Sequence, residues 1–253
     1  MAVIGILTCQ IFELEWAELL SADSDIEQIT IIENEKSKKL ADALEKKGLT
    51  NINRIPHLNS FKPEPSEQLQ LLIRVFDFSL HRNRKLLART LHKEAQPMQC
   101  YVDCFLLGYG LCGNTLLDPS DVLDTDKPIF IANDPSGGTV DDCIGLLIGG
   151  RECYHAELCK QAGTFFMTAG WVNHWDKILN PKYSKVDAPM AQRMFKRYKR
   201  TLLVNSPVMQ QQEMENGVNH FNNLFACQSE NKMGNLTIFK DTWNRAKQSL
   251  VKK

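Results

Sequence analysis

Short apolar runs alternate with segments of helical periodicity along most of this chain, and that alternation constrains the fold more than any other feature. Val3–Thr8 is a β-branched and apolar run that predicts a buried strand, and Ile29–Ile32 predicts a second one. A helical pattern follows each run, and the second pattern ends at Gly48, a residue type that commonly closes a helix. Further strands are predicted at Tyr101–Gly108, Pro128–Ala132, Gly163–Thr168, Thr201–Asn205 and Asn235–Phe239.

Strands that alternate with helices indicate a mostly parallel sheet with helices on both faces. We therefore predict a three-layer, Rossmann-like α/β fold. One long helix is expected from Leu69 to about Glu94, where apolar residues recur at helical spacing, and another from Asp141 to about Gln161. Ser206-Pro207 is typical of a helix start, and residues 241–250 are predicted to form a closing helix.

Length and composition indicate an ordinary folded protein. At about 150 residues per domain, 253 residues correspond to one or two domains. We expect a single α/β domain over residues 1–253, in which residues 180–253 extend the same sheet. The 30 basic and 30 acidic side chains cancel, so nucleic acid is not an expected partner. The apolar run Cys143–Gly150 is too short to span a membrane, so a membrane is not expected either.

The chain contains eight cysteines, and their chemical environment decides what they can do. A chain of this length can bury a core without disulfides. Met1–Thr8 has neither a basic segment nor a small-residue cleavage site, so a reducing cytoplasm is expected. The thiols are then core residues, metal ligands or nucleophiles.

Three of the cysteines fall at predicted strand ends, where open α/β sheets bind ligands. Cys9 directly follows the first strand, Cys112 lies in a glycine-rich turn after Tyr101–Gly108, and Cys143 begins the helix after the next strand. Three thiols at one rim predict a metal site, either zinc with an open position or an iron–sulfur cluster with one exchangeable corner. A helix start beside Cys143 would also stabilise its thiolate.

Other residues near these strand ends are candidates for ligand binding. The turn that holds Cys112 also spells G-x-G-x-x-G, but no full crossover helix fits before Asp118-Pro-Ser120, so a dinucleotide site is only a weak alternative. Its glycines let the main chain approach a ligand or adopt positive φ. The candidate ligand-binding residues are Gly110, Gly113, Asn114, Asp134, Asp142, Arg151 and Trp171.

Two readings without a metal stay open. In the first, Cys112 is a nucleophile and one of His57, His155 or His174 is its base. In the second, the protein is an interaction subunit and its cysteines only pack, since cysteine is among the most buried residue types. The remaining five cysteines are interpreted as structural: Cys100, Cys104, Cys153, Cys159 and Cys227.

These motifs resemble an uncharacterised bacterial and archaeal family, a domain of unknown function. The resemblance lies in Leu7-Thr-Cys9, Gly108-Tyr-Gly-Leu-Cys-Gly-Asn114, Asp142-Cys143, Gly150-Arg-Glu-Cys-Tyr154 and Gly163–Trp171. It covers most of the chain, and the YGLCGN turn is its most specific element. The sequence departs from the family pattern at Asp142, where the family has histidine, at Thr115, where it has glycine, and at Cys153, which replaces an arginine.

The resemblance implies that Cys9, Cys112 and Cys143 belong together. It also implies a setting, because members of the family look like neighbours of corrinoid-dependent methylamine methyltransferase systems in methanogens and some anaerobes. We therefore expect a metal-binding protein that acts as an accessory or methyl-transfer partner in anaerobic one-carbon metabolism. Its partner would be a corrinoid protein or a methyltransferase subunit, and a corrinoid would be carried by that partner. If the family histidine is a fourth ligand, Asp142 replaces it here or the site differs.

Overall fold

The computed structural model describes residues 2–65, 68–178 and 188–251, and its main sheet is parallel throughout. The strand order is β3-β2-β4-β1-β5-β6, and every neighbouring pair is parallel. The carboxyl ends of the strands therefore meet at one edge, as the sequence predicts. The strands are β1 (Ala2–Cys9), β2 (Ile26–Ile32), β3 (Ile52–Ile55), β4 (Leu69–Phe76), β5 (Cys104–Gly108) and β6 (Ile129–Phe130).

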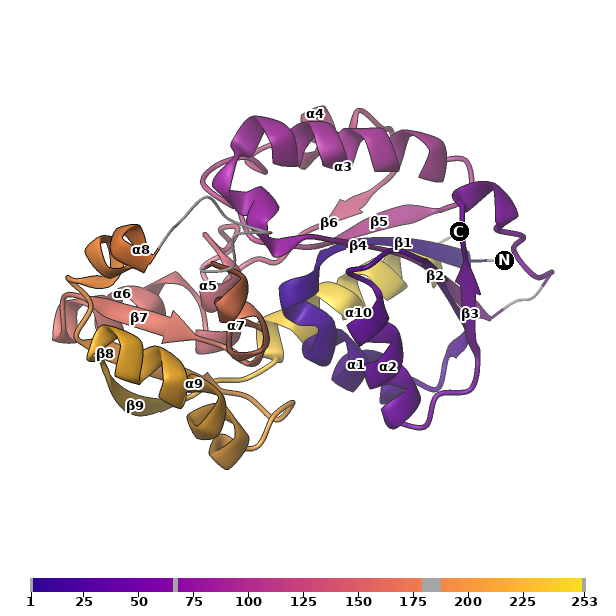
Figure 1. The fold of residues 1–253 in the computed structure, drawn as a ribbon. Coiled ribbons are helices and arrows are strands. Elements are labelled where there is room, and N and C mark those ends of the chain that lie inside the picture. Colours follow the sequence, from indigo (N-terminus) through magenta and orange to yellow (C-terminus); the bar gives the residue numbers. More distant parts are fainter. Residues whose placement is uncertain (1, 66–67, 179–187, 252–253) are drawn as a thin grey trace.

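Helices cover both faces of this sheet, which confirms the predicted three-layer α/β class. Helices α3 and α4 lie on one face, and α1, α2 and α10 lie on the other (Figure 1). Burial on both faces explains why β1 and β4 are apolar almost without interruption. These helices are α1 (Glu13–Ser21), α2 (Lys38–Lys46), α3 (Arg84–Met98), α4 (Pro119–Leu123) and α10 (Thr237–Val251).

A second, three-stranded parallel sheet has the order β7-β8-β9. The expectation that residues 180–253 extend the first sheet is therefore wrong for the strands. The first sheet stops at β6, which is only two residues long, and α10 alone returns to pack on β5 and β6. We call the second sheet and the helices around it the second layer of the molecule. Its elements are α5 (Cys143–Ile148), α6 (Arg151–Lys160), β7 (Thr164–Met167), α7 (Ala169–His174), α8 (Ala188–Phe195), β8 (Arg200–Asn205), α9 (Gln211–Phe225) and β9 (Gln228–Met233).

The predicted helix from Leu69 to Glu94 is wrong over its first half. Leu69–Phe76 forms β4, which pairs with β1 on one side and β2 on the other, and only Arg84–Met98 is helical. A strand buried on both faces has no polar alternation, so its apolar pattern also fits a helix. A short 3-10 turn, η3 (Phe78–Arg82), joins the two elements.

Two further expectations are corrected. Asn235–Phe239 was predicted as a strand, but Thr237 begins α10, and the buried Ile238 and Phe239 face the core from that helix. The single helix predicted from Asp141 to Gln161 is two helices, α5 and α6. Gly149 and Gly150 separate them, with φ of 105° and 102°, values that break a right-handed helix.

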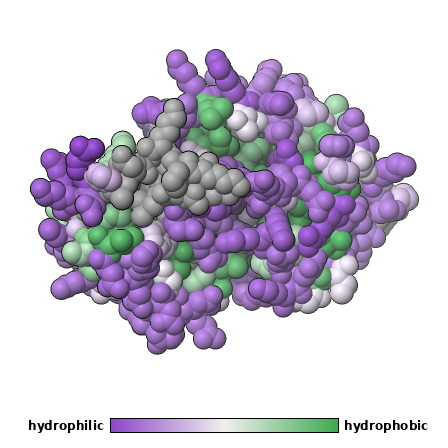
Figure 2. Space-filling model, viewed as in Figure 1, coloured by the Kyte–Doolittle hydropathy of each residue, from purple (hydrophilic) through white to green (hydrophobic). Residues whose placement is uncertain are grey.

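The core is continuous across both sheets. Buried apolar residues from β1, β4 and β5 belong to the same cluster as those from β7, β8 and α9. The face shown in Figure 2 is mostly hydrophilic, with hydrophobic side chains in small separate patches. Within the described residues, no helix combines the length and the apolar character that crossing a membrane requires.

Candidate functional site

A cavity of about 290 Å³ lies where the carboxyl edge of the first sheet meets the second sheet. Cys9, Cys112 and Cys143 all line it. The structure thus brings together the three cysteines that the sequence singles out, while their role as ligands stays a prediction. Four of the predicted ligand-binding residues line the same cavity: Gly110, Gly113, Asp142 and Trp171.

Cys9 is the last residue of β1, a central strand between β4 and β5. Its side chain is buried, and burial raises the pKa of its thiol far above the usual range. Trp16 fixes the end of the strand, because its indole N–H donates to the Thr8 hydroxyl at 2.7 Å. Cys9 therefore presents its thiol from a rigid, central position.

Main-chain pairing carries Cys112 toward Cys143. The Leu111 and Cys112 N–H groups donate to the carbonyls of Val140 and Asp141 at 2.8 and 3.0 Å. Gly110 permits this approach, because a Cβ there would lie 2.7 Å from the Val140 carbonyl oxygen. The glycine-rich turn thus works by close packing of two main-chain segments.

The turn itself is left-handed at three successive positions. Cys112, Gly113 and Asn114 have φ of 46°, 66° and 68°. A non-glycine residue in this region costs about 1 kcal/mol or more, so surrounding contacts must hold Cys112 and Asn114 in place. Burial, and then the nearby Asp142, raise the pKa of the Cys112 thiol to about 12.

Cys143 opens α5, and Asp142 caps that helix. The Asp142 Oδ1 accepts hydrogen bonds from the N–H groups of Ile144 and Gly145 at 2.9 and 3.1 Å. We expected the helix start to stabilise the Cys143 thiolate, but the pKa of this thiol is not lowered. Burial raises its pKa well above the usual value, with Asp142 as the second cause.

Trp171 contacts Cys143 directly. Its indole N–H donates to the Cys143 sulfur at 3.4 Å. Trp171 sits in α7, whose start packs on the turn after β1 through Gly170. A Cβ on Gly170 would lie 1.8 Å from the Ile11 carbonyl oxygen, so this contact requires glycine.

Three predicted ligand-binding residues have other structural roles. Asn114 holds a left-handed position in the turn. Asp134 accepts hydrogen bonds from the Ser136 N–H and hydroxyl at 3.0 and 2.6 Å, which orders its own loop. Arg151 forms a two-point ion pair with Asp141, at 2.9 and 2.8 Å, on the surface. None of the three is among the side chains that line the cavity.

The five cysteines that we interpret as structural are all placed outside the cavity lining. Cys104 and Cys227 are buried, whereas Cys100, Cys153 and Cys159 are exposed. None of the eight cysteines, all of which lie in the described residues, forms a disulfide. Position in the fold thus separates the cavity thiols from the other five.

No local sequence pattern indicates the aromatic side chains that line the cavity, or His81. Phe78, Tyr109, Tyr154, Phe165 and Tyr198 line the cavity. His81 also lines it, from η3, directly after β4. Because Leu69 to Glu94 was predicted as one helix, nothing marked His81 as a strand-end residue. Loss of solvent around the ring lowers the pKa of His81, although the residue keeps part of its surface exposed at the mouth.

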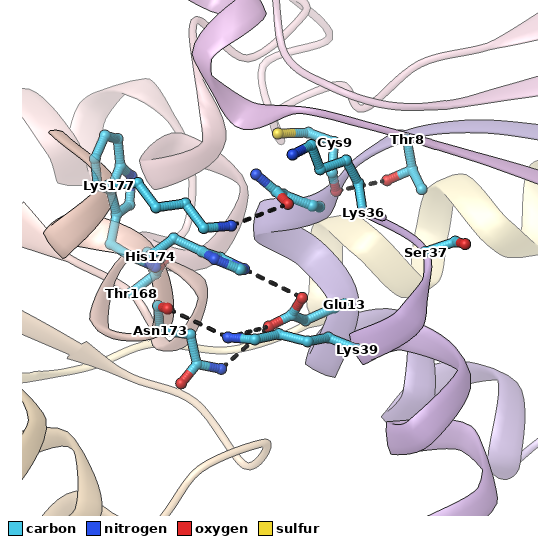
Figure 3. Close-up of polar contacts among 12 residues, drawn as sticks. Thr8, Cys9, Glu13, Lys36, Ser37, Lys39, Thr168, Asn173, His174 and Lys177 are labelled. Atoms are coloured by element: carbon cyan, nitrogen blue, oxygen red, sulfur yellow. Dashed lines mark hydrogen bonds and ion pairs between the residues drawn. The ribbon is translucent and has the colours of Figure 1, made fainter. Parts of the chain in front are cut away.

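A polar layer joins the two halves of the molecule beside Cys9 (Figure 3). His174 Nε2 lies 3.2 Å from the Glu13 carboxylate, and both side chains are buried. The Asn173 side chain also donates to Glu13, at 3.2 Å, and Lys39 donates to the Asn173 carbonyl at 3.3 Å. His174 is thus engaged with Glu13 and does not line the cavity, and neither do His57 and His155.

The arrangement of the side chains limits which metal group the site could bind. In residues 2–65, 68–178 and 188–251, no group of three or more His, Cys, Asp or Glu side chains is placed to hold a metal ion. A single zinc ion is therefore not matched by the thiols as they stand. A cluster binds each thiolate to a different iron, so its ligands lie farther apart than those of one ion. The three thiols share one cavity and come from three separate segments of the chain.

Comparison with known proteins gives a family and no function. A family model described as "Protein of unknown function (DUF1638)" matches residues 75–243. The match includes Cys112, Cys143 and Trp171 and begins after Cys9. A search of curated proteins finds no match. Since the model covers well over half of the sequence, the chain belongs to the DUF1638 family of proteins of unknown function.

Proposed function

We propose that this protein binds an iron–sulfur cluster through Cys9, Cys112 and Cys143, with one iron left open toward the cavity. One observation supports the proposal above all others: three free thiols from three separate segments line a single cavity. Thiolates are the usual ligands of such clusters. When bound, the cluster would supply one-electron chemistry or a Lewis-acidic iron at the open corner.

The surroundings of the thiols favour a bound cation over an empty nucleophilic site. Among the described residues that line the cavity there is neither a lysine nor an arginine that could stabilise a free thiolate. The raised pKa of Cys112, to about 12, keeps that thiol protonated at neutral pH. A bound metal group displaces the thiol protons and supplies the missing positive charge. The reading of Cys112 as an unassisted nucleophile is correspondingly weaker.

The setting of the proposal comes from the family resemblance. We propose that the protein acts in a reducing cytoplasm as an accessory or methyl-transfer partner of a corrinoid protein or methyltransferase subunit. A cavity that is lined by aromatic residues and opens at the junction of two sheets gives the open corner a defined approach. Anaerobic co-purification of this protein with a cobalamin-loaded corrinoid protein tests this partnership. If the two proteins migrate as separate species, the partnership is rejected.

The cluster itself is tested by metal analysis of protein purified without oxygen. We expect iron and acid-labile sulfide in the wild type, with a broad absorption band that bleaches on reduction. Cys112→Ser should lose most of the iron, whereas Cys153→Ser, a change at an exposed thiol on α6, should retain it. Zinc without acid-labile sulfide would show that the site binds a single metal ion and not a cluster. Substoichiometric metal that is equal in the wild type and Cys112→Ser would reject a metal site altogether.

A further inference from the structure

We infer that a groove between α8 and the end of α9 is a docking site for an acidic, amphipathic helix of a partner protein. The groove has a volume of about 460 Å³ and shares no lining residue with the cavity of the thiols. Arg193 and Lys196 line it on the side of α8, and Leu224 and Phe225 line it on the side of α9. Because the groove is separate from the cavity, the inference does not depend on the proposed cluster.

Aromatic packing forms the floor of the groove. The Phe195 and Phe225 rings both line it, and their centroids lie 4.4 Å apart. Phe221 packs against both rings, at 5.1 and 4.8 Å. Phe195 also contacts Phe165, at 5.3 Å, and Phe165 lines the cavity. The groove and the cavity therefore share one aromatic cluster, and a preformed floor lowers the cost of ordering this surface when a partner binds.

Exposed apolar side chains accompany this floor. Leu224 lines the groove and is exposed, and Met190 and Met194 are exposed on α8. The two methionines lie four residues apart, so they are neighbours on one side of the helix. A group of exposed apolar residues marks an interaction surface more often than single ones do, and methionine adapts its shape to a partner.

The same surface is basic, although the chain as a whole has equal numbers of basic and acidic residues. Arg193, Lys196, Arg197 and Lys199 are exposed, and none of them forms an ion pair in the part of the chain that the structure describes. The sequence has no aspartate or glutamate at positions 188–212 or 216–229. The carbonyl end of α9 offsets only about half an elementary charge. The remaining positive charge is complementary to an acidic partner.

Shape selects a protein helix over a lipid surface as the occupant. Proteins that lie on a membrane usually present aromatic rings at its interface, whereas the rings of this site form the floor of a groove. A groove with an apolar floor fits the apolar face of another helix. Acidic residues that flank such a face would meet Arg193 and Lys196.

The experiment measures, by fluorescence anisotropy, the binding of two labelled helical peptides that have the same leucine face. One peptide carries glutamate on its polar face, and the other carries lysine there. The groove variant is Arg193→Glu/Lys196→Glu. The control, Lys85→Glu/Arg89→Glu at exposed positions on α3, changes the net charge equally. Wild type should bind the glutamate peptide at least about tenfold more tightly than the lysine peptide. The groove variant should lose at least about tenfold in affinity for the glutamate peptide, and the control less than about twofold.

A second pair of variants separates docking from charge attraction alone. Leu224→Ser should weaken binding of the glutamate peptide about fivefold, whereas Leu86→Ser, at another exposed leucine, should not. Equal losses in the two charge variants, or no loss in Leu224→Ser, would overturn the docking site. Wild type that binds phosphatidylserine vesicles but neither peptide would overturn it in favour of a lipid surface. A wild-type dimer that Arg193→Glu/Lys196→Glu dissociates would overturn it in favour of a second copy of the chain.

Discussion

The two walls of the cavity are built in different ways. On the side of the first sheet, main-chain geometry determines where the sulfur atoms lie. Cys9 is at the end of a strand, and Cys112 is in a left-handed turn that forms main-chain hydrogen bonds with residues 140–141. On the side of the second sheet, Phe165 and Tyr198 are placed by ring packing around Phe221 and Phe195. Two of the three thiols thus lie on the wall that main-chain geometry builds, and packed rings give the other wall its shape.

Substitution at the junction between the two walls should cause the largest loss of stability. Gly170→Ala forces a Cβ to within 1.8 Å of the Ile11 carbonyl oxygen, so α7 must move away from the first sheet. We expect a loss of at least about 3 kcal/mol in the free energy of unfolding. Thermal or urea unfolding measures it. Gly138→Ala is the matched control, because its Cβ meets nothing nearer than 3.9 Å. Equal stability of the two variants would contradict the close contact.

Removing a buried charge in the second layer should lower the free energy of unfolding more than removing a surface charge on the first sheet. Arg200, which is 4% exposed, contacts Glu157 at 3.3 Å and Glu230 at 2.9 Å and also donates to the Glu157 carbonyl. Arg200→Met leaves the Glu157 carboxylate buried with one cation fewer. We expect about 3 kcal/mol of lost stability by urea unfolding.

Arg54 offers the comparison on the first sheet. It pairs with Glu45 on the exposed surface, so Arg54→Met should change unfolding little. If both substitutions cost the same, the second layer does not depend on its buried ion pair.

A buried carboxyl group on α1, which packs on the first sheet, should make the stability of the protein depend on pH. Burial raises the pKa of Glu15 to about 8, and neither carboxylate oxygen has a hydrogen-bond partner in the described part of the chain. Between roughly pH 4.5 and 8 the folded protein holds a proton here that the unfolded chain releases. Glu15 therefore makes stability fall as pH rises, by up to about 1.4 kcal/mol per pH unit.

Glu15→Gln removes this contribution. We expect the free energy of unfolding of the variant, measured with urea, to increase relative to that of the wild type between pH 5.5 and 8. The control is Glu152→Gln, at an exposed position on α6. A difference between Glu15→Gln and wild type that is constant with pH would show that Glu15 is ionised in the folded protein.

The smallest expected effect concerns the contact between the walls. Trp171→Phe keeps a ring but removes the N–H donated to the Cys143 sulfur, which should cost about 0.5–1 kcal/mol. Trp175→Phe removes a similar bond, to the Gly217 carbonyl. Only Trp171→Phe should change the alkylation rate of Cys143 in metal-free protein. The same rate in both variants would show that the indole does not influence this thiol.

The sequence predicts the thiol wall better than the aromatic wall, for a physical reason. Cys9, Cys112 and Cys143 follow strands, and the rule that parallel strands end at one edge brings them together without knowledge of side-chain packing. The position of Phe165 depends on how the two sheets meet, which no local pattern records. The separate sheet of β7, β8 and β9 was missed for the same cause, because each strand alone has the same apolar pattern as those of the first sheet.

The errors in the first sheet have a different origin. Leu69–Phe76 was assigned to a helix because a strand buried on both faces loses the alternation that identifies strands. That one error concealed His81, which would otherwise have stood at a strand end like Cys9. A mistake in one element thus removed one residue from the candidate site.

The contact of Gly170 with Ile11 also fixes when the site can exist during synthesis. Cys9 emerges from the ribosome long before Gly170, and the aromatic wall is not complete until Tyr198 has followed. Until then the thiols of β1 and of the glycine-rich turn face no closed cavity. Any group that the cavity holds must be inserted late, into a nearly finished chain. The closed cavity can therefore form only after most of the protein has been translated.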